Sequence, residues 1–557
     1  MRRAVRFDNQ DIEKEIREIE SSEKASKLYQ YMKDYNNYSI TENGALGYQT
    51  AGHELLDLHF QVSSLRSCDE KYIIREFVKA YYSDPMYAVK WLFFLRDILE
   101  GLGERRSFRI GMKYLAISKP EIARTVMKLI PEYGRYDDLL MFLDTPLKSK
   151  VSTMIRKQLK KDMEHMKKGE PISLLAKWLP SNNTSSKETR RLAEILRKEW
   201  DMTPKEYRQM LSALRKYLGV LEVTISKNEW ENVDYKTVPA KANLKYENAF
   251  MKHDKERRIA YFENVILGEE NLNTKGLMPY EIVHRITSKK EIDYFECVLK
   301  DDILAELMWK KLTKEGFQNE WGLDGCIVVA DGSGSMMKRV SNATSVTALD
   351  VCQSLAIYFA EQLQGVFHNK VITFSGRPQW IDLESGTSLK EKLEIMYAHS
   401  EVANTNIEAV FNLLLDLACN ENVPSELLPK QVLIMSDMEF DEARRPDCWA
   451  EGTWTPFDER LFETIAKKYE KAGYSMPRLI FWNLCGRTNT IPMVEGENGI
   501  CLLSGFSQNA IKVAGNKQQK DPYQNLLDVL DGERYQPIED AIKDLMKTDD
   551  SSTIENI

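Results

Sequence analysis

The chain has 557 residues, 43% of them hydrophobic and 29% charged, with a formal net charge of −8, which is ordinary for a globular protein of about two to four domains. No apolar run approaches the roughly 18 residues that a membrane span needs, and the first residues lack the apolar core of a secretory signal. The eight cysteines form no C-x-x-C pair and there are only seven histidines, which argues against a zinc site or a disulfide framework and predicts a reducing, cytoplasmic location.

The N-terminal half has a helical pattern. Residues 1–40 form a charged segment, for which we expect a helix with a loose start. Within residues 41–315, apolar side chains recur at i, i+3 and i+4 spacing, as in AVKWLFFLRDIL (88–99) and KVSTMIRKQLKKDMEHM (150–166). Successive short helices joined by tight polar breaks predict an α-helical solenoid of degenerate, HEAT-like repeats.

This half also contains a basic block. Residues 101–220 hold 26 Lys and Arg against 14 Asp and Glu, a net charge of +12, so the remainder of the chain carries −20. Such a block is typical of a surface that binds a polyanion such as nucleic acid. The alternative is a solvated surface, because helical repeats commonly expose Lys and Arg, and charge alone leaves both interpretations open.

The pattern changes near residue 321. Short apolar or β-branched runs, typical of strands buried on both faces, alternate from there with segments of helical periodicity. The runs are GCIVVAD (325–331), NKVITF (369–374), KQVLIMSD (430–437), RLIFWNL (478–484) and GICLLSG (499–505). This alternation predicts a doubly wound parallel sheet, of Rossmann-like α/β type, over residues 321–545. The polar tail, residues 546–557, is expected to be disordered.

The first of these strands ends in D-G-S-G-S, residues 331–335. A nucleophile elbow needs G-x-S-x-G, which this frame does not supply. A helix cap or turn is a second interpretation, because Ser and Asp commonly cap helices after a strand. The third is a divalent-cation site, because one carboxylate and two hydroxyls offer hard oxygen atoms on a single loop.

Two further strand-end positions favour the cation site. Asp437 closes the run 430–437, and Thr405 opens a predicted helix. Ligands of doubly wound sheets bind at the carboxyl ends of the strands, where these residues are expected to meet. Oxygen ligands without Cys or His select Mg²⁺, Mn²⁺ or Ca²⁺.

This set of residues resembles the metal-ion-dependent adhesion site of von Willebrand factor A domains, whose pattern is D-x-S-x-S followed by a Thr and an Asp on separate loops. The resemblance covers about residues 321–515. The ligands that it implies are Asp331, Ser333 and Ser335 on the first loop, Thr405 on the second and Asp437 on the third. It also implies an open coordination position for water or for an Asp or Glu of a partner protein, with Ser436 as a residue that could orient a coordinated water.

Several segments of the chain resemble the domain of unknown function 2828 family, whose members join a helical region to a von Willebrand A-like domain. They include FFLRDILEGLGERRSFR (93–109), PEYGRYDDLL (131–140), MSDMEFDEA (435–443) and LLSGFS (502–507). A more distant resemblance, carried by RDI (96–98) and GER (103–105), is to the Ro ribonucleoprotein (TROVE) group. It implies a ring of HEAT-like repeats that binds structured or single-stranded RNA.

On that resemblance, side chains of the basic block would neutralise an RNA backbone. The predicted contacts are Arg105, Arg106, Arg109, Lys113, Arg156, Lys157, Lys160, Lys161, Arg190 and Arg191. Trp178, Tyr207 and Tyr217 are candidate stacking faces, with a place in the core as the alternative. An alternative for part of the region is inter-repeat ion pairing, of Arg96 with Asp97 and of Arg135 with Asp137 or Asp138.

Three functions are compatible with these patterns. The first is a Ro-like, RNA-binding scaffold whose sheet domain recruits partners, and the second is a metal-dependent protein-interaction module without nucleic acid. The third is a metal-dependent hydrolase, for which the sequence offers no P-loop, no second carboxylate cluster and no base with an orienting partner. We predict a non-enzymatic binding scaffold with RNA as first partner, a protein as second, and no membrane. The oligomeric state stays open.

Overall fold

A computed structural model of the chain describes residues 37, 39–42, 46–288, 298–316, 322–341, 344–374, 377–399, 407–439, 459–488, 490–492, 500–514 and 520–554. The chain divides into two structural units, each built from separate parts of the sequence. Of the described residues, the helical unit takes those in 70–271 and 532–554, and the sheet unit takes those in 37–69 and 272–531. Most of the predicted segment 1–40 lies outside the described residues.

The helical unit consists of α-helices and short 3-10 helices. They are α4 (Glu70–Ser83), α5 (Pro85–Arg96), α6 (Arg106–Ser118), α7 (Pro120–Val126), η2 (Met127–Leu129), α8 (Ile130–Tyr133), η3 (Tyr136–Asp144), α9 (Lys148–Lys168), α10 (Leu175–Trp178), α11 (Lys187–Glu199), α12 (Pro204–Tyr217), α13 (Leu221–Ser226), η4 (Trp230–Asn232), η5 (Tyr235–Thr237), α14 (Ala240–His253), α15 (Lys255–Leu267) and α23 (Gln536–Ile554). The predicted helical character of this region is therefore confirmed.

The helix boundaries follow local chemistry. Thr203 caps α12 by accepting a hydrogen bond from the Glu206 N–H, while the Glu206 carboxylate accepts from the Thr203 N–H, and Pro204 occupies the first turn. Helix α9 buries Val151, Ile155 and Leu159 at four-residue spacing and ends at a left-handed glycine. Such side-chain spacing and caps explain why periodicity located these helices correctly.

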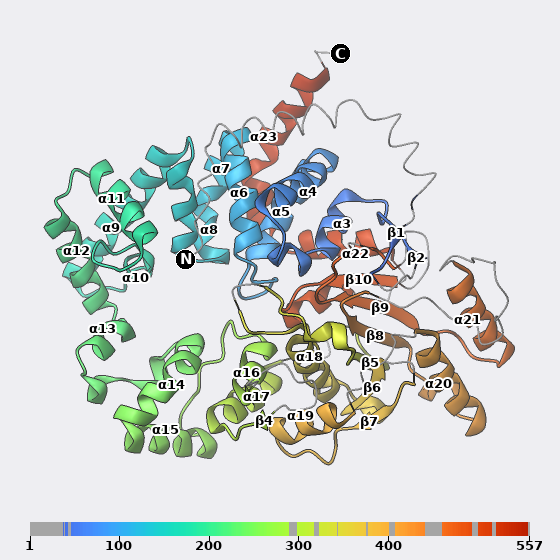
Figure 1. Cartoon of the computed structure of the whole chain (residues 1–557). Coiled ribbons are helices and arrows are strands. Elements are labelled where there is room, and N and C mark those ends of the chain that lie inside the picture. Colours follow the sequence, from blue (N-terminus) through green and yellow to red (C-terminus); the bar gives the residue numbers. More distant parts are fainter. Residues whose placement is uncertain are drawn as a thin grey trace. The chain divides into compact units, whose positions relative to one another are not determined.

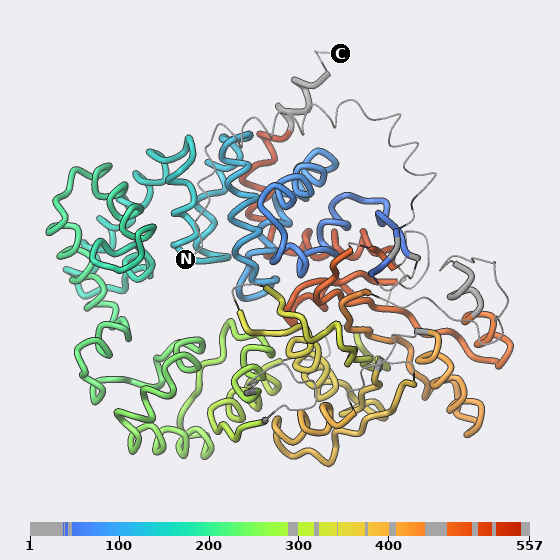
Figure 2. Tube along the Cα trace, in the orientation of Figure 1, coloured from blue at the N-terminus to red at the C-terminus, as the bar shows by residue number. Residues whose placement is uncertain are grey.

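The last helix of the chain belongs to the helical unit. Helix α23 packs against α5 and α7 (Figure 2). Just before it, Arg534 Nε donates to a carboxylate oxygen of the fully buried Asp97 at 2.8 Å. The Tyr133 hydroxyl donates to the Arg534 carbonyl at 2.6 Å. Asp97 therefore pairs with a residue 437 positions away, and α23 continues into the 546–557 segment.

The sheet unit contains the main sheet, two short hairpin-like pairs and several helices. Its elements are β1 (Ser39–Ile40), β2 (Leu46–Gly47), α3 (Glu54–Phe60), η1 (Ser64–Arg66), α16 (Pro279–Ile286), β3 (Thr287–Ser288), β4 (Val298–Leu299), α17 (Ile303–Glu315), β5 (Cys326–Asp331), η6 (Gly334–Met337), α18 (Ala348–Gln362), η7 (Gly365–Phe367), β6 (Lys370–Phe374), β7 (Trp380–Asp382), α19 (Leu389–Ala398), α20 (Ile407–Asn420), η8 (Ser425–Leu427), β8 (Gln431–Ser436), α21 (Glu459–Lys471), β9 (Arg478–Asn483), β10 (Ile500–Ser504), η9 (Gln508–Ala514) and α22 (Pro522–Leu530).

The main sheet has six strands in the order β10-β9-β8-β5-β6-β7 (Figure 1). The five predicted strands are present and run parallel to one another. The prediction of a wholly parallel sheet is wrong, because β7 pairs with β6 antiparallel at the edge. Only Ile381 of the three β7 residues is buried, so this edge strand lacks the continuous apolar run that identifies the others.

Helices cover this sheet because its strands are apolar on both faces. Helix α18 packs on β5, α16 and α17 pack against α18, and α3 packs on β10. Helices α3, α16 and α17 come from the predicted helical region 41–315, yet they lie in the sheet unit. No helix within the described residues is long and apolar enough to span a bilayer.

Candidate metal centre and basic surface

Two adjacent strands carry acidic side chains to the same edge of the sheet. All six residues of β5 are buried and the strand ends at Asp331, while β8 ends at Ser436, immediately before Asp437. Strands β6 and β7 lie on one side of β5, whereas β8, β9 and β10 lie on its other side. The strand order therefore reverses between β5 and β8. The carboxyl edge at such a reversal is the usual ligand-binding crevice of a doubly wound sheet.

A short hydrogen-bond network joins the first loop to the end of β8. One Asp331 carboxylate oxygen accepts from the Ser436 hydroxyl at 2.6 Å, and the other accepts from the Ser333 N–H at 2.9 Å. The hydroxyls of Ser333 and Ser335 lie 2.9 Å apart. The structure thus brings together the three predicted first-loop ligands and gives Ser436 direct contact with one of them.

Two buried carboxylates dominate the electrostatics of this edge. Asp331 and Asp437 are each about 1% exposed. Burial raises the pKa of Asp331 to about 7, and the neighbouring charge of Asp437 adds to the rise, against the hydrogen bonds from Ser436 and Ser333. A bound divalent cation would offset both the burial and the repulsion of these carboxylates.

The donor set fits a hard cation better than a soft one. Among the described residues, no group of three or more His, Cys, Asp or Glu side chains is arranged to hold a metal ion. A cation between Asp331 and Asp437 would therefore depend on serine hydroxyls and water for its other ligands, which suits Mg²⁺ or Mn²⁺. The predicted second-loop ligand, Thr405, lies outside the described residues, two positions before α20 begins.

Sequence patterns did not predict the arginine at this site. Arg487, on the loop after β9, donates from Nη1 to an Asp437 carboxylate oxygen at 2.8 Å and from Nε to Glu42 at 2.6 Å. The buried Glu439 carboxylate accepts from the backbone N–H groups of Arg487 and Glu42. No local pattern joins Glu42 to Arg487, because 445 positions separate them.

The backbone beside Asp437 is strained. Met438 has a φ of +60°, which is uncommon for a residue with a side chain, and it is buried. Its N–H donates to the Ser436 hydroxyl at 3.1 Å. Strain of this kind persists where the surroundings impose it, and it occurs frequently at functional sites.

A serine, a histidine and an aspartate also meet in the sheet unit. The Ser345 hydroxyl lies 2.9 Å from His284 Nε2, and His284 Nδ1 lies 3.6 Å from an Asp350 carboxylate oxygen. The second separation is too long for a hydrogen bond. That Asp350 oxygen instead accepts from the Thr347 N–H in the capping box of α18. The contacts describe a helix cap with a neighbouring Ser–His hydrogen bond.

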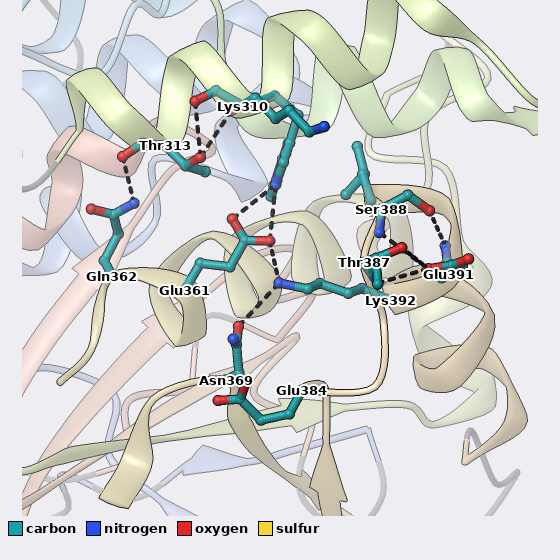
Figure 3. Close-up of polar contacts among 12 residues, drawn as sticks. Lys310, Thr313, Glu361, Gln362, Asn369, Glu384, Thr387, Ser388, Glu391 and Lys392 are labelled. Atoms are coloured by element: carbon teal, nitrogen blue, oxygen red, sulfur yellow. Dashed lines mark hydrogen bonds and ion pairs between the residues drawn. The ribbon is translucent and has the colours of Figure 1, made fainter. Parts of the chain in front are cut away.

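A cavity of about 290 Å³ lies beside the amino end of β6, at the edge of the sheet opposite Asp331. Its polar lining is internally paired (Figure 3). Lys392 Nζ donates to Glu361 at 2.8 Å and to Asn369 Oδ1 at 3.1 Å, and Trp309 Nε1 donates to Glu361 at 3.0 Å. Glu361 and Lys392 therefore neutralise each other, and we assign this network a structural role.

The predicted RNA contacts fall into two groups. Those on α9, namely Arg156, Lys157, Lys160 and Lys161, are all exposed, on the face opposite the buried Val151, Ile155 and Leu159. In the described part of the chain none of these four side chains forms an ion pair. They form two pairs at four-residue spacing, so their charges cluster on one side of α9, within about 8 Å along its axis.

Several other predicted contacts have structural partners. Arg109 Nε donates to Asp138 at 2.7 Å, and Arg105 lies 3.8 Å from Asp137. Arg191 pairs with Asp144 and Glu188, and Arg190 donates to the carbonyl oxygens of Thr184 and Ser185. Arg106 is exposed and Lys113 half-buried, both on α6.

The predicted ion pair of Arg135 with Asp137 is present. The predicted pair of Arg96 with Asp97 is wrong, because Arg96 donates to Asp138 and Asp97 accepts from Arg534. The candidate stacking residues also differ from one another. Tyr207 is fully buried and its hydroxyl donates to the Pro180 carbonyl, so the alternative of a place in the core holds for this residue. Tyr217 is 40% exposed, and the guanidinium of Arg135 lies 4.1 Å from the ring centroid of Trp178.

Two family models match this chain, and both describe domains of unknown function. Residues 185–316 match domain of unknown function DUF2828, and residues 325–550 match domain of unknown function DUF7788. The chain is also similar to the uncharacterized protein L728 of Acanthamoeba polyphaga mimivirus, with 29% identity over 538 residues, covering 90% of this chain and 89% of that protein. The predicted resemblance to the 2828 family is thus found over residues 185–316, whereas the four segments named for it above lie outside that match. Most of the sheet unit matches a different family model.

Proposed function

We propose that this protein is a non-enzymatic, divalent-cation-dependent binding protein. Its sheet unit acts as a von Willebrand factor A-like domain that presents a cation to an acidic group of a partner protein. The observation that carries this proposal is the meeting of two buried carboxylates, Asp331 and Asp437, with the Ser333 and Ser335 hydroxyls where strand order reverses. The strained Met438 beside Asp437 supports the same location.

The residues of the chain have separate roles in this proposal. Asp331, Ser333 and Ser335 hold the cation from the first loop and Asp437 from the third, while Ser436 orients Asp331 through its hydroxyl. The bound cation supplies positive charge that attracts a carboxylate from outside. Because the site offers few protein ligands, we expect the partner's carboxylate to complete the coordination.

Cation binding is expected to depend on Asp331. Calorimetric titration of the full chain with Mg²⁺ or Mn²⁺ should show one site, and Asp331→Ala should abolish the binding because it removes the only carboxylate on the first loop. Asp382→Ala, which removes an exposed carboxylate from the edge strand β7, is the matched control and should bind as the native chain does. Unchanged binding in Asp331→Ala would contradict the proposal.

A second candidate function is binding of RNA by the helical unit. We propose it on one observation, the exposed basic face of α9, which carries four charges with no ion-pair partner among the described residues. These charges lie within six residues, about 8 Å along the helix axis, and their long side chains can contact neighbouring phosphates of a single strand. The distant likeness to the Ro group and the HEAT-like arrangement of helices belong to this proposal.

Charge reversal on α9 is expected to lower the affinity for RNA and to make that affinity depend less on salt concentration. Because the variant can no longer neutralise four phosphates, the slope of log K against log salt for single-stranded RNA should fall by about 3. The residues to change to Glu are Arg156, Lys157, Lys160 and Lys161. A matched control reverses four exposed lysines on α14 and α15, namely Lys241, Lys245, Lys252 and Lys255. Fluorescence anisotropy with a labelled oligonucleotide measures both, and an equal effect of the two sets would argue against a specific α9 surface.

A further inference from the structure

Arg487 lies directly against the candidate metal centre. Its guanidinium donates from Nη1 to Asp437 at 2.8 Å and from Nε to Glu42 at 2.6 Å, and it bridges the two carboxylates. Its side chain is 21% exposed, whereas that of Asp437 is 1% exposed. The arginine therefore covers the buried carboxylate from the solvent side.

The position of Arg487 is held by buried contacts. The Glu439 carboxylate, itself about 1% exposed, accepts from the backbone N–H of Arg487 at 2.6 Å and of Thr488 at 3.0 Å. Its other oxygen accepts from the Glu42 N–H at 2.8 Å. One buried carboxylate thus holds both the arginine and the Glu42 that orients its guanidinium.

The charges at this position favour a paired arginine. Burial opposes the charged form of Arg487, but Asp437, Glu439 and Glu42 outweigh it and raise its pKa. Arg487 bonds one Asp437 oxygen and the Glu439 N–H donates to the other at 3.2 Å, so a cation that binds Asp331 and Asp437 meets oxygens that already have partners. Two positive groups within a few ångströms also repel each other strongly at a buried site.

We propose that Arg487 is a built-in counter-ion that competes with the divalent cation for Asp437. This inference rests on the proposed function. In the cation-free protein the guanidinium neutralises Asp437, and cation binding requires it to leave that carboxylate. The displacement breaks one contact, since the bond to Glu42 can be kept. Arg487 therefore lowers the affinity of the site and couples cation binding to movement of the loop after β9.

The test compares Arg487→Gln with Lys338→Gln by Mn²⁺ titration of the full chain. The glutamine side chain is neutral and too short to pair with Asp437, so Mn²⁺ should bind Arg487→Gln at least tenfold more tightly than the native chain. Lys338 Nζ lies 3.2 Å from Glu42 and makes no contact with Asp437 in the described structure. Its replacement removes the same charge nearby, so it should change the affinity less than threefold.

The outcomes separate the two proposals. If the native chain binds Mn²⁺ and Arg487→Gln binds it equally or more weakly, the counter-ion role is wrong and the cation site stands. Equal tightening in both variants also overturns the counter-ion role, since net charge alone would then explain it. If neither the native chain nor Arg487→Gln binds Mn²⁺, the cation site itself is wrong.

A second measurement uses the native chain and does not depend on folding of the glutamine variant. The ¹⁵N resonance of Arg487 Nε–H can be assigned by its absence from the spectrum of Arg487→Lys. Saturating Mg²⁺, which is diamagnetic, should shift this resonance as the guanidinium leaves Asp437. A resonance that stays in place while Mg²⁺ binds would overturn the displacement.

Discussion

Replacing Asp138 by Ala is expected to destabilise the helical unit by about 3–5 kcal/mol, the usual consequence of leaving a buried charge unpaired. Asp138 is fully buried and accepts from Arg96 Nε at 2.8 Å, Arg109 Nε at 2.7 Å and the Arg135 N–H at 3.0 Å. The Arg96 side chain is only 3% exposed, so its guanidinium cannot recover water in place of Asp138.

The charges of this cluster depend on one another. Burial works against the charged form of Asp138, but Arg96 and Arg109 outweigh it and hold its pKa below the ordinary value. Burial likewise lowers the pKa of Arg96, and Asp138 opposes that shift. Removing the carboxylate therefore leaves Arg96 with the full penalty of its burial. Arg109, which was predicted to contact RNA, belongs to the same cluster and already pairs with Asp138.

The neighbouring aspartate provides the control. Asp137 pairs with Arg105, Arg109 and Arg135, but it is 19% exposed, so Asp137→Ala should cost only about 1 kcal/mol. Hydrogen exchange of the amides in α5, α6 and η3 measures the stability of this region directly. Equal protection in the two variants would show that the burial of Asp138 does not matter.

The cation-free protein is expected to become more stable as the pH falls from about 8 to about 4. The pKa of Asp331 is about 7 in the folded chain, whereas an aspartate in the unfolded chain has its ordinary pKa of 3.8. The folded state therefore binds a proton at Asp331 more tightly than the unfolded state does. The resulting stabilisation is complete below about pH 4 and is lost as the pH rises through 7. The shift corresponds to at most about 4 kcal/mol.

Asp331→Asn isolates this contribution from the other titrating groups. The neutral amide does not titrate. The free energy of unfolding of the variant should therefore change less between pH 4 and pH 8 than that of the native chain, by at most about 4 kcal/mol. Thermal unfolding with a chelator between pH 4 and 8 measures both proteins. Since a cation prefers the ionised carboxylate, added Mg²⁺ should stabilise the native chain more at pH 8 than at pH 5. Parallel pH profiles for the two proteins would contradict a raised pKa at Asp331.

The strands and helices were largely predictable because the side chains that each of them buries recur at a regular spacing along the sequence. A run such as CIVVAD is apolar at every position but its last because β5 is covered on both faces, and it was identified for that reason. Strand β7 has three residues and one buried side chain, so no such pattern marks it. The long helix α9 shows the apolar spacing of a helix with one buried face, and its predicted bounds were close to the observed ones.

The candidate site was predictable only in part. The spacing of Asp331, Ser333 and Ser335 identified the first loop, because these residues share a turn and their proximity is local. Asp437 was found because it ends a second apolar run. Glu42, Glu439 and Arg487 were missed, because Glu42 meets the other two across about 400 positions, and Glu439 meets Arg487 across 48. Contacts at such separations leave no periodicity.

The sequence by itself determined the alternation of strands and helices, the helical character of the first half and the acidic and hydroxyl groups at the end of β5. These features depend on neighbours within a few residues along the chain. Only the tertiary structure decided that β7 runs antiparallel, that Asp97 binds Arg534, and that Arg487 pairs with Asp437. Charged partners brought together by folding depend on the path of the whole backbone, and no short stretch of sequence contains that information.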